Sequence, residues 1–155
     1  IVKGRIEKPR TIKGYLIKDQ SGNQVRIISQ EKDHALPIET VYEPLGGNSD
    51  YTVLKVLLVT GRSHQIRAHL ASIGHPLIGD PKYGDPKINK QVKHAYGIQY
   101  QMLHSWQLHF PEMKETFSYL SGKRFMAPLP PEFGRFMKQQ GIVLPNNIDQ
   151  TEERI

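Results

Sequence analysis

The strongest indications of the fold lie in residues 51–70, Tyr51-Thr-Val-Leu-Lys-Val-Leu-Leu-Val-Thr60 followed by Gly61-Arg-Ser-His-Gln-Ile-Arg-Ala-His-Leu70. In residues 51–60 both alternating sets of side chains are apolar, which predicts a buried strand in the centre of a covered sheet. Ser63 is positioned to cap a following helix that Gly74 would stop. The apolar residues of this helix recur at helical spacing and predict packing on the sheet: Ile66, Leu70 and Ile73.

The segments on either side predict more strands and a second helix. The expected strands are residues 11–17, 24–29, 34–42, 102–110 and 116–120. The turn-rich residues 19–23 predict a hairpin between the first two, and residues 43–50 read as a loop. Pro130-Pro131 opens a short helix whose apolar face holds Phe133, Phe136 and Met137. This order favours an α+β fold, in which helices pack on a mostly antiparallel, mixed sheet with a central buried strand.

Composition narrows the class of protein. The chain has 155 residues, 37% of them apolar, which suits one domain with a core. It holds no cysteine, which excludes a disulfide scaffold, a thiolate zinc site and a cysteine nucleophile. The longest apolar run, residues 56–59, is too short to cross a bilayer, so we expect no membrane partner. Because the sequence has no cysteine and shows no secretory signal, we expect a reduced, cytoplasmic compartment.

The net charge of +6 is concentrated in two segments. Residues 1–30 carry seven basic and two acidic side chains, and residues 61–110 carry six and two. An ordinary solvated surface and a surface that contacts phosphate groups both fit this pattern. Composition does not choose between them.

The junction between the strand and the helix holds the side chains best suited to chemistry. The free backbone N–H groups of a helix N-terminus favour an anion, and Arg62 could add a bidentate clamp on a phosphate. Arg67 lies one turn inside the helix, where it could reach a carboxylate; a solvated surface arginine is the alternative. Asp80, between Gly79 and Pro81, is expected to fix a turn rather than to take part in catalysis.

Metal and serine-hydrolase chemistry are both disfavoured. His64 and His69 would lie about 140° apart around a helix, so they cannot share one ion. The sequence holds no His-Glu-x-x-His zinc motif and no Gly-x-Ser-x-Gly nucleophile elbow. We therefore expect no metal site.

Two runs of the sequence resemble the C-terminal signature of the ribosomal large subunit pseudouridine synthases. They are residues 60–70, Thr-Gly-Arg-Ser-His-Gln-Ile-Arg-Ala-His-Leu, and residues 73–84, Ile-Gly-His-Pro-Leu-Ile-Gly-Asp-Pro-Lys-Tyr-Gly. Met102-Leu-His-Ser105 and Ala127-Pro-Leu-Pro130 agree with it. The resemblance implies that residues 1–140 are the C-terminal part of a pseudouridine synthase catalytic domain and that residues 141–155 are a C-terminal tail.

The catalytic aspartate of that family has no counterpart in this chain. By resemblance it belongs to a His-Arg-Leu-Asp-x-x-Thr-Ser-Gly motif, which precedes a tyrosine in a strand ending Val-x-Gly. Neither motif is present, although Val2-Lys3-Gly4 is similar to the end of that strand. We therefore expect a chain that begins after the nucleophile and is inactive alone, because a site without its nucleophile loses nearly all activity.

The resemblance also implies a function and a set of site residues. The full enzyme would isomerise uridine to pseudouridine in RNA, ribosomal RNA above all, through a covalent aspartate and without a metal or small-molecule cofactor. Arg67 is the position that pairs with the catalytic aspartate. The expected substrate and RNA contacts are Arg62, His64, Gln65, Lys82 and Leu103, of which Leu103 is either a contact to the base or part of the core. A non-catalytic RNA-binding module is the alternative, and the oligomeric state is left open.

Overall fold

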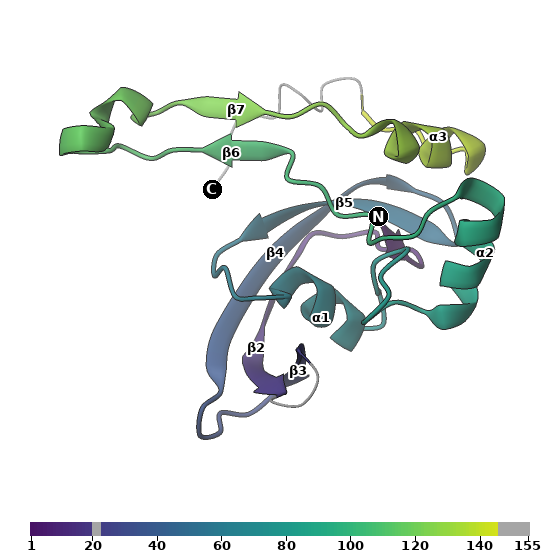
Figure 1. Cartoon of the computed structure of the whole chain (residues 1–155), viewed down its shortest axis with the longest axis horizontal. Helices are drawn as coiled ribbons and strands as arrows, with labels where there is room; N and C mark the ends of the chain where they lie inside the picture. The colour runs from purple at the N-terminus through teal and green to yellow at the C-terminus, as the bar shows by residue number, and fades with distance from the viewer. Residues whose placement is uncertain (20–22, 146–155) are drawn as a thin grey trace.

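The structure, a computed structural model, describes residues 1–19 and 23–145 (Figure 1). Within these residues it holds a five-stranded sheet, a two-stranded ribbon, three α-helices and one 3-10 helix. In chain order the elements are β1 (Val2–Lys3), β2 (Arg10–Asp19), β3 (Gln24–Ile28), β4 (Leu36–Gly47), β5 (Tyr51–Leu58), α1 (Gln65–Ser72), α2 (Pro86–Tyr96), β6 (Gln107–His109), the 3-10 helix η1 (Glu115–Leu120), β7 (Arg124–Met126) and α3 (Pro131–Gln139).

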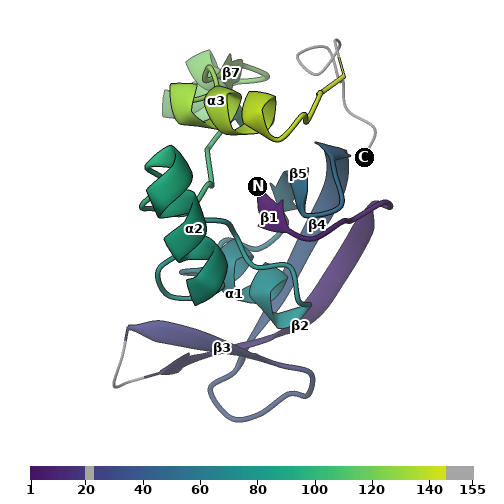
Figure 2. The same ribbon diagram turned by 90° about the vertical axis from the view of Figure 1, so that its right-hand side faces the viewer.

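The larger sheet has the strand order β1-β5-β4-β2-β3, and every neighbouring pair is antiparallel. Figures 1 and 2 show α1 lying against the sheet, with α2 beside it and the β6–β7 ribbon reaching out as an arm. The predicted α+β class and the hairpin of β2 with β3 are confirmed. The turn predicted over residues 19–23 lies partly outside the described residues, which omit residues 20–22.

β4 is longer than the sequence predicted, because it continues to Gly47 through the expected loop. Its register with β5 shifts between Pro44 and Gly46, which is a β-bulge. A bulge accommodates a proline inside a strand, since proline cannot donate a ladder hydrogen bond. The loop predicted over residues 43–50 is therefore reduced to the turn around Asn48, whose Oδ1 accepts from the backbone N–H groups of Asp50 and Tyr51.

β5 is not the central, fully covered strand that its apolar pattern predicted; β4 occupies the middle of the sheet. β1 pairs with β5 only at Tyr51 and Thr52. Farther along, Leu57 and Leu58 are 41% and 47% exposed. A pattern of apolar side chains reports which residues suit burial, but the covering elements come from elsewhere in the chain.

Two shorter predictions were wrong. Residues 116–120 belong to the 3-10 helix η1, and β6 pairs with β7. Ser63 does not cap α1, because the N-cap position is held by His64 in the left-handed region, with φ of 57° and no side-chain cap. Gly74 does end this helix, with φ of +84° and its N–H donated to the Ala71 carbonyl.

α2 was not predicted, although its two ends carry ordinary signals. Asp85 caps its N-terminus by accepting from the N–H groups of Lys87 and Ile88, Pro86 occupies the first turn, and Gly97 ends it in the left-handed region. Within the described residues, no helix is both long enough and apolar enough to pass through a membrane.

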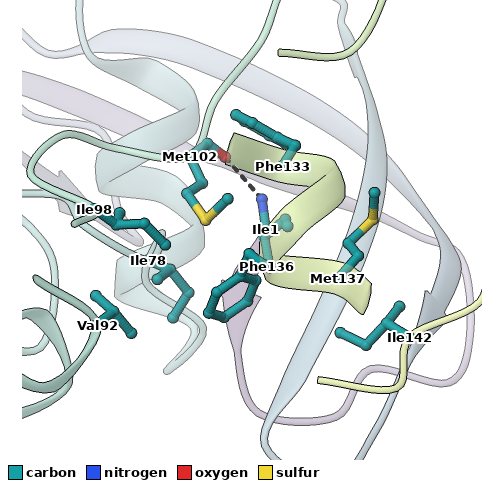
Figure 3. Close-up of a cluster of buried hydrophobic side chains, with 9 residues drawn as sticks. All are labelled: Ile1, Ile78, Val92, Ile98, Met102, Phe133, Phe136, Met137 and Ile142. Atoms are coloured by element: carbon teal, nitrogen blue, oxygen red, sulfur yellow. Dashed lines mark hydrogen bonds between the residues drawn. The ribbon is translucent and has the colours of Figure 1, made fainter. Parts of the chain in front are cut away.

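Three packed regions hold the described part of the fold together, and one of them sets α1 against β2, β3 and β4. A second buries α1 on the sheet through Leu70, Ile12 and Tyr42, as the spacing of its apolar residues predicted. The third joins α2, α3 and the first residue of the chain (Figure 3). There the amino group of Ile1 donates to the Met102 carbonyl at 2.7 Å. The side chains that build this third cluster are Ile1, Ile78, Val92, Ile98, Met102, Phe133, Phe136, Met137 and Ile142.

Candidate functional site

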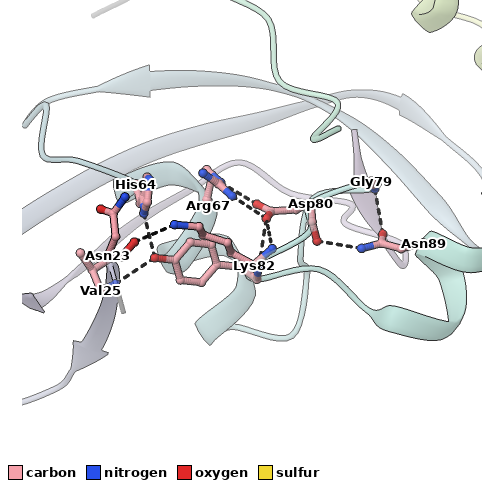
Figure 4. A network of polar contacts seen from close by, with 9 residues as sticks. Asn23, Val25, His64, Arg67, Gly79, Asp80, Lys82 and Asn89 are labelled. Atoms are coloured by element: carbon pink, nitrogen blue, oxygen red, sulfur yellow. Dashed lines mark hydrogen bonds and ion pairs between the residues drawn. The ribbon is translucent and has the colours of Figure 1, made fainter. Parts of the chain in front are cut away.

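A buried ion pair between Arg67 and Asp80 stands at the centre of the polar residues (Figure 4). Nε and Nη2 of Arg67 donate to the two carboxylate oxygens of Asp80, each at 2.7 Å. The Arg67 side chain is 12% exposed and that of Asp80 is fully buried. Two parallel, charge-assisted hydrogen bonds fix the plane of the guanidinium group as well as its position.

Asp80 also holds the loop that follows it. Its Oδ1 accepts from the backbone N–H groups of Lys82 and Tyr83, which makes the turn that the sequence predicted. Burial alone would raise the pKa of Asp80, but the hydrogen bonds from Arg67 and from these two N–H groups outweigh it and lower the pKa. The carboxylate is therefore ionised at neutral pH.

Tyr83 connects this pair to the N-terminal hairpin. Its hydroxyl accepts from the backbone N–H of Val25 at 2.8 Å and lies 3.0 Å from Nδ1 of His64. The guanidinium carbon of Arg67 stacks 5.2 Å from the centroid of the Tyr83 ring. Burial and the positive charges of Arg67 and Lys82 lower the pKa of His64, so its imidazole is mainly neutral at pH 7.

Asn89 ties the Asp80 loop to α2. Its Oδ1 accepts from the N–H of Gly79 at 2.9 Å, and its Nδ2 donates to the Asp80 carbonyl at 2.7 Å. Gly79 has φ of +75°, and a Cβ atom there would collide with the Tyr100 carbonyl. The loop is thus held on one side by α1 and on the other by α2.

Gln65 is a buried link between α1 and the sheet. Its Nε2 donates to the Glu39 carbonyl and to Thr40 Oγ1, and its Oε1 accepts from Thr60 and from the N–H of Arg62. This side chain takes over the role expected of a Ser63 cap, because it satisfies a backbone N–H just before the helix. With 2% of its surface exposed, Gln65 shapes the turn that carries Arg62 and does not itself reach the surface.

Thr40 also lies 3.0 Å from Nδ1 of His69. Since Thr40 accepts from Gln65, its hydroxyl proton is free to be donated to that nitrogen. Burial lowers the pKa of His69, partly opposed by a hydrogen bond to the Lys13 backbone. This neutral histidine anchors the helix that carries Arg67.

The predicted site residues fall into two groups. Arg67, His64 and Lys82 lie together around the Asp80 loop, where Lys82 Nζ donates to the Asn23 carbonyl. Arg62 is exposed beyond the start of α1, and Leu103 is 39% exposed. Met102, next to Leu103, donates its N–H to the Ile78 carbonyl, which places this segment beside the start of the Asp80 loop.

The sequence did not identify Tyr83 and Asn89 as site residues, and it gave Asp80 only a structural role. The pairing of Asp80 with Arg67 spans thirteen residues and depends on the tertiary fold, so no local pattern predicts it. The described residues hold no group of three or more His, Cys, Asp or Glu side chains that could bind a metal ion.

The sequence model described as RNA pseudouridylate synthase matches residues 1–72, from β1 to the end of α1. Over these residues, just under half of its length, the chain is similar to this family. A ribosomal large subunit pseudouridine synthase C from Buchnera aphidicola is 34% identical over 95 residues, 61% of this chain and 30% of the relative. An uncharacterized RNA pseudouridine synthase from Helicobacter pylori is 32% identical over 142 residues, 87% of this chain and 46% of the relative.

The fold agrees with this similarity. The solved structure of human RNA pseudouridylate synthase domain containing 1 superposes with a TM-score of 0.71 at 23% identity, covering 96% of this chain and 60% of that one. The chain spans less than half the length of the two curated relatives described above, from Buchnera aphidicola and Helicobacter pylori. The pseudouridine synthase fold predicted from the sequence motifs is confirmed.

Proposed function

We propose that this chain is the C-terminal part of the catalytic domain of an RNA pseudouridine synthase, with ribosomal RNA as the substrate and the cytoplasm as the compartment. The reaction breaks the bond between N1 of uracil and the ribose, turns the base, and joins C5 to the ribose, with loss of the C5 proton. An aspartate outside this sequence would form the covalent bond, to the sugar or to the base. No metal or redox cofactor takes part.

The observation that carries this proposal is that the Arg67 guanidinium uses only some of its N–H donors within the described residues. Asp80 uses the edge formed by Nε and Nη2, while Nη1 has no hydrogen-bond partner among the described residues. The opposite edge of the fork therefore has free donors for a second carboxylate, the catalytic aspartate. The positive charge of Arg67 beside such an aspartate lowers its pKa, so the aspartate stays ionised, and the hydrogen bonds fix its orientation.

Apart from Gln65, the other predicted residues would contact the RNA. Leu103 would touch the target base after it leaves its stack, and Arg62, His64 and Lys82 would bind its flanking sugar and phosphate groups. Gln65 would act by holding the backbone that presents Arg62. The basic N-terminal strands would add phosphate contacts.

The test is release of tritium from C5-labelled uridine in RNA. The whole protein should release it, and residues 1–155 alone should not exceed the blank. In the whole protein, Arg67→Ala should abolish turnover and leave RNA affinity nearly unchanged. Arg67→Lys should restore only part of the rate, since lysine lacks the planar fork that forms the bidentate pair with Asp80. RNA binding by the whole protein with no tritium release would support a non-catalytic RNA-binding module.

A further inference from the structure

α2 carries a row of lysines on the side that faces away from the core. Val92 of this helix is buried and Ile88 packs beside it, whereas Lys87, Lys90 and Lys93 are exposed. Residues three apart are neighbours on a helix, so the three ammonium groups share about a third of its circumference. We call Lys87, Lys90 and Lys93 the α2 lysine stripe.

No carboxylate neutralises the stripe locally. The sequence has no acidic residue between Asp85 and Glu112. Asp85 itself is engaged, because it caps α2 and pairs with Lys3 Nζ at 2.8 Å. The three lysines have no side-chain hydrogen bond or ion pair within the described residues, so their charge is available to a ligand.

A groove of about 250 Å³ adjoins the stripe. Lys90 and Lys93 stand on one side of it, Gly79 and Pro81 on another, and Ile98 contributes an apolar surface. Ligand pockets for drug-sized molecules begin at about 300 Å³, so this groove has room for one base or ribose of a nucleotide and not for a larger group. It combines apolar walls for a base or ribose with two positive charges for a phosphate.

The groove and the candidate catalytic site lie on opposite sides of the Asp80 loop. The Asp80 side chain faces Arg67, and the neighbouring Gly79 and Pro81 face the groove. Asn89 holds that loop through two hydrogen bonds (Figure 4). It also lines the groove. An RNA strand with one nucleotide at Arg67 can therefore continue past the loop onto α2.

We propose that the α2 lysine stripe and this groove form an auxiliary binding surface for single-stranded RNA next to the target uridine. The lysines bind successive phosphates as point charges, and the groove takes one unstacked nucleotide. This inference rests on the proposed function, since it assumes that the partner is RNA. It assigns α2 to substrate affinity and leaves the chemical step to the Arg67 side of the loop.

The test compares two triple variants of the whole protein that lose the same charge. One replaces the stripe (Lys87→Gln, Lys90→Gln, Lys93→Gln), and the control replaces three exposed lysines elsewhere (Lys32→Gln, Lys114→Gln, Lys138→Gln). The dissociation constant of a single-stranded, uridine-containing RNA is measured across a salt series. Each phosphate contact contributes a slope of about 0.7 in log K against log salt, so the stripe variant should lose about 2 from the slope and about 100-fold in affinity near 0.1 M salt.

Two further measurements separate the parts of the proposal. At saturating RNA the stripe variant should keep the wild-type single-turnover rate. Gln99→Trp, which fills the groove without changing charge, should weaken affinity with the salt slope unchanged.

The inference is overturned if the stripe variant keeps the wild-type slope, or if the control variant loses as much. Pseudouridine formation by the wild type together with an unchanged slope would refute the stripe and leave the proposed function standing. A wild type that binds RNA without forming pseudouridine, while the stripe variant loses its slope, would refute the proposed function and support the stripe.

Discussion

Asp80→Asn isolates the energy of the buried ion pair, because it removes the charge and keeps most of the shape. Asparagine retains an Oδ1 that can accept from the N–H groups of Lys82 and Tyr83, so the turn survives. Its amide nitrogen would replace Oδ2 and face Nε of Arg67, where donor meets donor. Arg67, 12% exposed, is then left as a poorly compensated charge.

Removing one partner of a buried ion pair costs about 3–5 kcal/mol. Because Arg67 keeps some contact with water, we expect the lower end, about 3 kcal/mol of unfolding free energy. With a urea m-value of about 2 kcal/mol/M, this corresponds to a midpoint lowered by about 1.5 M. Asp33→Asn, at an exposed position, is the matched control and should change stability by less than about 0.5 kcal/mol.

The assay is urea unfolding of the 155-residue chain, monitored by circular dichroism, in a double-mutant cycle with Arg67→Met. The double variant Arg67→Met, Asp80→Asn should recover much of the loss, because an apolar side chain of similar volume replaces the charge. The pH adds a second check. The pKa of Asp80 is lowered from 3.8, so the stabilisation by the wild-type pair is complete above pH 3.8 and is lost as the pH falls through the lower, folded value.

The reasoning is refuted if Asp80→Asn unfolds within about 0.5 kcal/mol of the wild type, or if its acid unfolding curve below pH 3.8 has the wild-type shape. Either result would mean that the pair contributes little and that the turn alone explains Asp80.

Three further outcomes follow from the packing. The pKa of His69 should lie below 6.5 in an NMR chemical-shift titration, because burial disfavours the charged ring. Stability should therefore fall as the pH drops below 6.5, since the unfolded chain takes up the proton more readily than the folded one. A normal pKa would contradict the burial of His69. Phe136→Ala should cost about 4 kcal/mol in urea unfolding, because Phe136 is 1% exposed; a loss under about 1 kcal/mol would place it outside the core. Gly79→Ala should lower thermal stability well beyond Gly74→Ala, since both have positive φ but only Gly79 has a backbone carbonyl in the way; equal losses would contradict the crowding.

Local patterns predicted those elements whose signals lie within a few residues. The spacing of Ile66, Leu70 and Ile73 predicted how α1 packs, and Pro130-Pro131 predicted the start of α3. These predictions succeeded because helical periodicity and proline at a first turn are properties of the segment itself.

The wrong predictions concern residues whose partners lie far away in the sequence. The cap expected of Ser63 is replaced by Gln65, whose partners include the carbonyl of Glu39, 26 residues away. The burial expected for β5 depends on the strands and helices that pack against it, and these come from other parts of the chain. Asp80 was assigned to a turn, and it does make that turn, but a carboxylate has two oxygens and can serve the turn and Arg67 together. Tertiary partners of this kind leave no local signal.

The pairing with Asp80 gives Arg67 a property that a lone arginine would lack. A free arginine side chain loses about 2 kcal/mol of rotamer entropy when it is fixed. In this chain Asp80 fixes the side chain before any second carboxylate arrives, and the hydrogen bonds to Asp80 keep the guanidinium charged by raising the pKa of Arg67. An aspartate approaching Nη1 would meet a donor already in place. The entropy of the Arg67 side chain is lost when the chain folds, so the catalytic step does not have to order it. Asp80 then acts as a positioning residue, and in the whole protein Asp80→Asn should raise the pKa seen on the acid side of the rate profile while Arg67 is still present. A pH profile that does not move would show that the orientation of Arg67 does not depend on Asp80.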